Sequence, residues 1–184
     1  MLSKRAFRSQ LVVQGQRSLF DYWLQAAGPR QMPARSDIDP RGVPKLLPNI
    51  GLIDVSDGLD AAKFRLAGTR LYDVYGREIT GQRVGQVFSG EHADYWRRAH
   101  ERVLATGTPH HGVVRGPAEG RDHIVLFWLR LPLSQDGRSV DRILCLDIAA
   151  PAETATVTVL QPQLRYAPIL PVRTVAEPRQ VHCG

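Results

Sequence analysis

The chain has 184 residues, of which 43% are hydrophobic and 23% are charged. These values suit one folded domain with extensions, and they exclude a wholly disordered chain and a coiled coil. The net charge is +6, and the excess lies in residues 1–50, which hold eight Lys or Arg against three Asp. The longest apolar run, residues 124–129, is too short to cross a bilayer, and two cysteines cannot make a disulfide framework. We therefore expect no transmembrane segment and a cytoplasmic protein.

The first residues carry much of the basic excess, and we expect residues 1–17 to form a solvated N-terminal arm. Lys4, Arg5, Arg8 and Arg17 could bind nucleic acid or another anionic surface, which is the alternative function for this chain. A nucleic-acid-binding domain usually carries its positive charge on a folded face instead. Nucleic acid is therefore the less favoured partner.

Apolar residues at helical spacing predict a helix over residues 18–28. Ser18 suits its N-cap, and Gly28 suits its end. Its apolar stripe consists of Leu19, Phe20, Trp23 and Leu24. So rich a stripe on a short helix needs a covering surface. A Pro-containing connector follows, in which Asp39 and Pro40 begin a short turn.

From Ile50 onward the pattern changes to the alternation that is typical of strands. Residues 50–55 and 63–68 are predicted to pair as a hairpin around a tight turn at residues 56–58. Residues 69–88 contain three glycines and predict short helical turns. A longer helix is expected between a cap at Ser89 and a stop at Gly107. Three more strands are predicted over residues 110–115, 123–133 and 140–148.

Runs of strands joined by turns, with helices grouped between them, indicate the α+β class with an antiparallel sheet. The strand at residues 123–133 shows what must cover that sheet. If Arg130 faces water, the alternation places Val125, Phe127 and Leu129 on the inner face. The outer face then carries Ile124, Leu126 and Trp128. Such an apolar face needs a cover, either the stripe of the helix at residues 18–28 or a second copy of the chain.

Several stretches, taken in chain order, resemble a known family. Residues 64–81 and 85–88 resemble the first half of a PAS domain, in which a strand leads into short glycine-containing helices. Tyr22-Trp23 and residues 35–40, 46–48 and 132–134 resemble a bacterial PAS subfamily long catalogued as a domain of unknown function. The resemblance covers about residues 18–150.

The resemblance implies a five-stranded antiparallel sheet with short helices on one face and an N-terminal helix flanking the other. It further implies a non-enzymatic sensory or protein-interaction module in bacterial signal transduction, which forms a homodimer and reports to a partner protein. Residues 151–184 hold five of the thirteen prolines, and this composition predicts a Pro-rich tail. Residues 154–160 of that tail alternate like one added strand.

PAS domains can enclose a small ligand between sheet and helices, although the sequence does not identify a cofactor. The residues predicted to line such a cavity are Phe64, Leu66, Tyr72, Tyr75, Trp96, His100, Phe127 and Leu129. Complete filling of the core by these side chains is an equal alternative. The residues predicted for the interface on the outer face are Leu19, Phe20, Trp23, Leu24, Ile124, Leu126 and Trp128.

We find no catalytic constellation and no metal-binding pattern in the sequence. A Gly-x-Ser-x-Gly elbow is missing, and Gln82-Arg83 stand where a phosphate-binding loop needs Lys and Ser or Thr. The family resemblance nominates His100 as a haem ligand, but one histidine on one helix is weak support. Cys145, which lacks a flavin-binding motif around it, is expected to be a core residue.

Overall fold

The computed structural model describes residues 4–153 and contains one five-stranded antiparallel sheet in the order β2-β1-β5-β4-β3. Its strands are β1 (Ile50–Asp54), β2 (Lys63–Ala67), β3 (His110–Arg115), β4 (Ile124–Leu133) and β5 (Arg142–Pro151). The antiparallel α+β fold predicted from the order of elements is confirmed. The proposed strand at residues 154–160 lies outside the described residues.

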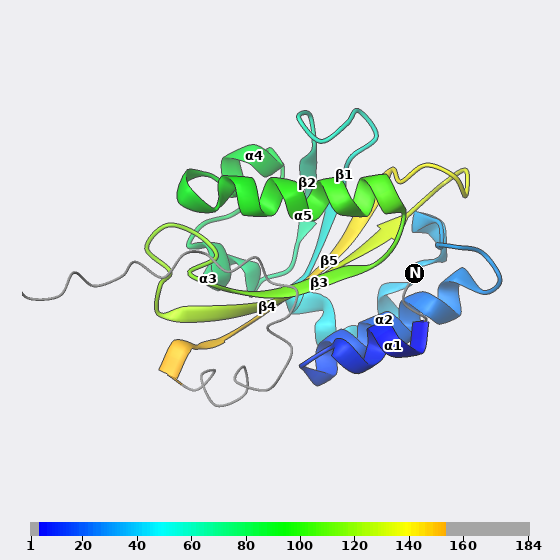
Figure 1. Cartoon of the computed structure of the whole chain (residues 1–184), viewed down its shortest axis with the longest axis horizontal. Coiled ribbons are helices and arrows are strands. Elements are labelled where there is room, and N and C mark those ends of the chain that lie inside the picture. Colours follow the sequence, from blue (N-terminus) through cyan, green and yellow to red (C-terminus); the bar gives the residue numbers. More distant parts are fainter. Residues whose placement is uncertain (1–3, 154–184) are drawn as a thin grey trace, which may run out of the picture.

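Helical elements cover both faces of this sheet (Figure 1). The inner face is covered by α3 (Leu71–Tyr75), α4 (Val84–Val87) and α5 (Ala93–Thr106), and the short turn η4 (Gly90–His92) precedes α5. The outer face is covered by α1 (Lys4–Gln10), α2 (Gln14–Ala27) and η3 (Pro44–Asn49), and the short turns η1 (Arg35–Asp37) and η2 (Pro40–Gly42) lie between α2 and η3 along the chain. Within residues 4–153, no helix combines the length and the apolar character that a membrane crossing requires.

Several boundaries differ from those expected. Helix α2 begins at Gln14, before Ser18, because the Gln16 side chain accepts hydrogen bonds from the backbone N–H groups of Val12 and Val13 at 3.1 and 3.3 Å. It ends as expected at Gly28, where φ is 57°. A longer loop, residues 55–62, replaces the predicted tight turn between β1 and β2. Helix α5 starts at Ala93, after a separate turn at η4.

Residues 4–17 do not form the solvated arm that their charge suggested. The ring centroid of Phe7 lies 4.9 Å from that of Phe20, and Leu11 is buried. The guanidinium of Arg8 pairs with Asp21 at 2.6 Å, and Arg17 donates a hydrogen bond to the Leu11 carbonyl at 2.6 Å. Burial of the apolar residues therefore outweighs the local charge, and this segment packs on the domain.

The alternation along β4 was predicted correctly, but its two faces were assigned the wrong way round. Leu126 and Trp128 lie in the inner core under α3–α5, whereas Phe127 and Leu129 lie on the outer face near the N-terminal segment. The error came from Arg130, which was expected in water and is fully buried on the inner face. A carboxylate on the neighbouring strand, that of Asp147, makes this burial tolerable.

The stripe of α2 packs on the outer sheet face of its own chain. Leu19, Phe20 and Trp23 are buried against the leucines of β4 and β5, and Leu24 is partly buried beside them. The indole N–H of Trp23 also donates to the Pro132 carbonyl at 2.9 Å. A cover for this face was therefore predicted correctly, and its intramolecular form is the one that the structure contains.

Candidate functional site

A buried ion pair lies at the centre of the inner core. Arg130 on β4 and Asp147 on β5 have side chains that are 0% exposed. One guanidinium nitrogen of Arg130, Nη1, lies 2.7 Å from Oδ1 of Asp147, and the other, Nη2, lies 3.3 Å from Oδ2. Burial alone lowers the pKa of Arg130, but attraction to Asp147, Cys145 and Tyr75 and the hydrogen bond to Asp147 together raise it above its ordinary value. Arg130 is therefore held in its charged form beside Asp147.

His100 on α5 joins this pair as a neutral imidazole. Its Nδ1 lies 2.8 Å from the Trp96 carbonyl, which can only accept, so Nδ1 carries the proton. Its Nε2 then accepts a hydrogen bond from Arg130 Nε at 3.3 Å. Burial and the adjacent Arg130 charge lower the pKa of His100 to about 3. The ring is consequently uncharged near neutral pH.

Tyr75 on α3 completes the network from another helix. Its hydroxyl donates to Asp147 Oδ2 at 2.8 Å, and burial raises its pKa well above the ordinary value. None of the buried polar side-chain atoms of Tyr75, His100, Arg130 and Asp147 lacks a hydrogen-bond partner. We call these four residues the inner network. The inner network thus joins two helices, α3 and α5, to two strands, β4 and β5, through hydrogen bonds and one ion pair.

Aromatic rings surround the inner network. The guanidinium carbon of Arg130 lies 5.1 Å from the Trp96 ring centroid and 5.6 Å from that of Trp128, which are cation–π distances. Phe88 stacks on Trp96 with centroids 4.4 Å apart, and its ring also lies 5.5 Å from Tyr75 and from His100. Side chains of this chain therefore occupy the centre of the inner core.

The structure brings together only part of the predicted cavity lining. Phe64, Tyr75, Trp96 and His100 meet in the inner core. Tyr72 and Leu66 are 57% and 45% exposed and do not belong to it. Leu66 leaves the inner side because the β1–β2 register shifts between Leu52 and Ile53, so that Leu66 pairs with the outer residue Leu52.

The remaining predicted site residues are also divided between the two faces. Phe127 and Leu129 lie on the outer face and line no inner cavity. Leu126 and Trp128 lie in the inner core and form no outer interface with α2, while Ile124 is partly buried at the start of β4. Only the helical part of the predicted interface, the stripe of α2, lies where it was expected.

Sequence reasoning missed Arg130 and Asp147 as site residues. Each is a charged residue with apolar neighbours on both sides, well inside a ten-residue strand. Opposite charges isolated in this way on two strands joined by a hairpin are a signal for a buried pair, because a lone buried charge is costly. The faces of β4 were predicted instead from the expectation that a charged residue faces water.

The inner network does not fit a haem. Both ring nitrogens of His100 are engaged, one as donor to Trp96 and one as acceptor from Arg130, so neither is available to iron. Burial raises the pKa of the Cys145 thiol to about 12, which keeps it protonated and unreactive. Among residues 4–153 there is no group of three or more His, Cys, Asp or Glu able to hold a metal ion.

Comparison with known proteins gives one family and a set of folds. A family model described as PAS domain matches residues 12–147. No curated protein matches the chain. Among solved structures, the RsLOV d2 variant has 16% identity and a TM-score of 0.44, with 54% of this chain and 57% of that chain covered. The chain thus spans little more than half the length of that protein.

Two further structures show the same range of similarity. The Rhodobacter sphaeroides LOV protein has 15% identity and a TM-score of 0.48, with 66% of this chain and 73% of that chain covered. A domain of an HTR-like protein from Haloarcula marismortui has 12% identity and a TM-score of 0.41, with 55% and 97% covered. These likenesses concern the fold alone and carry nothing about ligands.

Proposed function

The chain belongs to the PAS domain family, and on this premise we propose that it is a non-enzymatic module of bacterial signalling that acts in the cytoplasm through contact with a partner protein. One observation carries the proposal. The space between the sheet and helices α3–α5 holds the inner network and its aromatic rings, whose polar groups pair with one another. Such an interior favours signalling by contact over signalling by a resident ligand.

The chemistry of the inner network supports a non-enzymatic role. A general acid or base works best when its pKa lies near the working pH. The pKa of His100 is about 3 and that of Cys145 about 12, and both side chains are buried. Neither group is ready to exchange protons with a substrate at neutral pH.

A homodimer remains part of this proposal, but its contact surface differs from the predicted one. The outer face of β4 and β5 is covered by α2 of the same chain. A second copy would therefore bind elsewhere, and the exposed Leu66 on the edge strand β2 is a residue that such a contact could bury.

A small-ligand sensor is the second candidate, and the buried charge of Arg130 favours it. A buried ion pair stabilises a fold no better than apolar residues of similar volume, so its presence calls for another role. The carboxylate of a ligand could take the place of Asp147 as the partner of Arg130, since Arg binds planar oxyanions in a bidentate manner. The inner network would then be the sensing site.

Native mass spectrometry of freshly purified protein separates the two candidates. The contact module predicts the mass of the bare chain or of its dimer. A stoichiometric small-molecule adduct that is present in the wild type and absent from Arg130→Met would contradict it and support the sensor. A matched Leu131→Met variant, changed on the outer face, should behave as the wild type in either case.

The alternative function through the basic N-terminal residues has less support than the sequence suggested. Arg8 and Arg17 are engaged within the fold, which leaves Lys4 and Arg5 among the four cations considered. Binding of a DNA duplex at rising salt concentration tests this alternative. A steep loss of affinity that Lys4→Gln/Arg5→Gln abolishes would restore it.

A further inference from the structure

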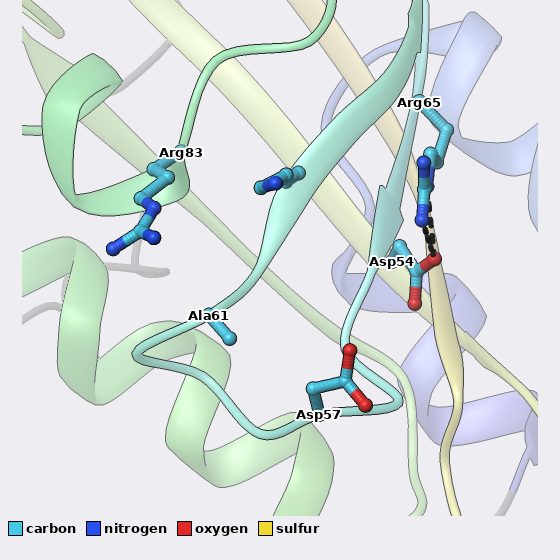
Figure 2. A pocket seen from close by; sticks show the side chains of 6 residues that line it. Asp54, Asp57, Ala61, Arg65 and Arg83 are labelled. Atoms are coloured by element: carbon cyan, nitrogen blue, oxygen red, sulfur yellow. Dashed lines mark hydrogen bonds and ion pairs between the residues drawn. The ribbon is translucent and has the colours of Figure 1, made fainter.

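A charged cleft lies beside the hairpin of β1 and β2 (Figure 2), and no residue of the inner network lines it. It has a volume of about 110 Å³. The residues that line it are Asp54, Asp57, Ala61, Lys63, Arg65 and Arg83. Pockets for drug-sized ligands begin at roughly 300 Å³, so this cleft suits a single small group.

The carboxylate of Asp54 is already fully engaged within the wall of the cleft. It accepts hydrogen bonds from the Ser56 hydroxyl at 2.6 Å and from Arg65 Nε at 2.9 Å, and it pairs with Arg142 at 2.8 Å. Burial alone would raise its pKa, but these donors lower it to about 2. Two guanidinium groups, those of Arg65 and Arg142, thus share the Asp54 carboxylate. Asp54 therefore does not neutralise Lys63 or Arg83.

Lys63 and Arg83 lie opposite each other in an antiparallel bridge. Backbone hydrogen bonds from Phe64 to Gln82 at 3.0 Å and from Val84 to Ala62 at 2.9 Å fix this pairing. Like charges directly opposite each other on paired strands are destabilising. Within residues 4–153, neither side chain makes a hydrogen bond or an ion pair that would offset this repulsion.

Lys63 and Arg83 therefore have no ion-pair partner among residues 4–153, and the cleft beside them has room for an anion. We propose that the cleft binds a phosphate group between Lys63 and Arg83, with Arg65 in its wall. Two cations without an ion-pair partner attract a doubly charged phosphate more strongly than a singly charged carboxylate. The group comes either from free inorganic phosphate or from a phosphomonoester carried by another molecule.

Asp57 provides an internal test of this assignment. It comes from the loop between β1 and β2, and its carboxylate faces the cleft (Figure 2). A negative charge at this position repels an incoming phosphate. Removing that charge should therefore tighten binding, whereas removing the cations should weaken it.

The experiment is a titration of the full chain, labelled with ¹⁵N, with inorganic phosphate at constant ionic strength. The amide signals of Ala61, Lys63 and Arg83 should shift in a saturable manner. Lys63→Met/Arg83→Met should weaken binding about tenfold or more, and Asp57→Asn should tighten it about threefold. The matched control Lys45→Met/Arg70→Met, two exposed cations that do not line the cleft, should bind as the wild type.

Parallel titrations with acetate and with O-phosphoserine identify the class of anion and its source. Phosphate and phosphoserine that bind alike indicate recognition of the phosphate group alone, whereas tighter binding of phosphoserine indicates a phosphorylated partner. Non-saturating shifts, equal binding of acetate, or equal weakening by the control pair would overturn the proposal. Because the cleft lies outside the inner network, either result leaves the function proposed above unaffected.

Discussion

The two faces of the sheet are both covered by helices, but they are stabilised by different chemistry. The outer face under α2 is a leucine-rich apolar core, in which Gln16 is a buried polar side chain. The inner face under α3–α5 holds a buried ion pair together with His100 and Tyr75. Alternate residues of the one strand β4 supply both cores, with Arg130 on the inner side and Leu131 on the outer.

This difference in chemistry predicts how substitutions on each face affect the stability of the fold. An apolar layer loses stability in proportion to the surface that is uncovered, at about 25 cal/mol for each Å². A charged network responds abruptly instead, because removal of one member leaves its partner buried and unpaired. The outer face should therefore tolerate conservative substitution, while the inner face should tolerate only paired changes.

The largest expected effect is the loss of the cover on the outer face. Deletion of residues 1–28 removes Leu19, Phe20 and Trp23, each of which stabilises the fold by about 1.5–3 kcal/mol. This sum approaches the whole stability of an ordinary domain. Light scattering and thermal melting should show aggregation or loss of cooperative unfolding. A truncated protein that stays soluble, with the oligomeric state and the melting temperature of the full chain, would refute this role of α2.

The second largest effect should follow from Arg130→Met, which leaves the Asp147 carboxylate buried without its cation. We expect urea denaturation to show a loss of about 3–5 kcal/mol. The double variant Arg130→Met/Asp147→Leu should recover part of it, although the Tyr75 hydroxyl then lacks its acceptor. Leu131→Met, the matched change on the outer face, should cost less than about 1.5 kcal/mol. Equal losses in the two single variants would show that the faces do not differ.

Gln16 tests whether the polar exception on the outer face matters. Its amide nitrogen donates to the Trp128 carbonyl at 2.9 Å, and its amide oxygen accepts from two backbone N–H groups that precede α2. Gln16→Met leaves these three backbone groups without their hydrogen-bond partner. It should lower the free energy of unfolding, measured by urea denaturation, by about 1–3 kcal/mol. A stabilised variant would show instead that the outer face prefers to be wholly apolar.

The effect that is smallest near neutral pH is a dependence of stability on pH that belongs to the inner face. Unfolded His100 takes up a proton below pH 6.5, but folded His100 does so only below about pH 3. Its contribution to stability is therefore present above pH 6.5 and is lost as the pH falls toward 3, by about 1.4 kcal/mol for each pH unit.

His100→Gln removes this titration while it keeps a donor and an acceptor in place. Urea denaturation between pH 7.5 and 4.5 should thus show a steeper loss for the wild type than for the variant. The lowered pKa values of His110 and His111 act in the same direction in both proteins and cancel in the comparison. Parallel curves would contradict the neutral, buried state of His100.

Much of the fold followed from local patterns. The alternation from Ile50 onward located all five strands, and Gly28 and Gly107 ended their helices as expected, at φ values of 57° and 59°. A glycine at a positive φ is a local preference that does not depend on distant contacts. Residues 4–17 were misjudged because their packing depends on contacts of Phe7 and Leu11 that lie far along the chain.

The candidate site was less predictable than the fold. Trp96, His100 and Tyr75 were named from the sequence, but the ion pair that joins them was not. Arg130 and Asp147 become neighbours only when the hairpin of β4 and β5 forms and helices close over it. The bulge near Arg65 likewise moved Leu66 from the inner to the outer side, which alternation alone does not reveal.

Local patterns along the chain are enough to predict the antiparallel α+β architecture and the need to cover both faces of its sheet. Strand and helix periods and glycine stops are properties of short segments, so they can be read without coordinates. Which residues of β4 lie on the inner face and which on the outer depends on tertiary contacts, because burial of Arg130 requires a carboxylate from another strand. The same holds for the cleft of Lys63 and Arg83, whose bridge brings together two segments that the sequence keeps apart.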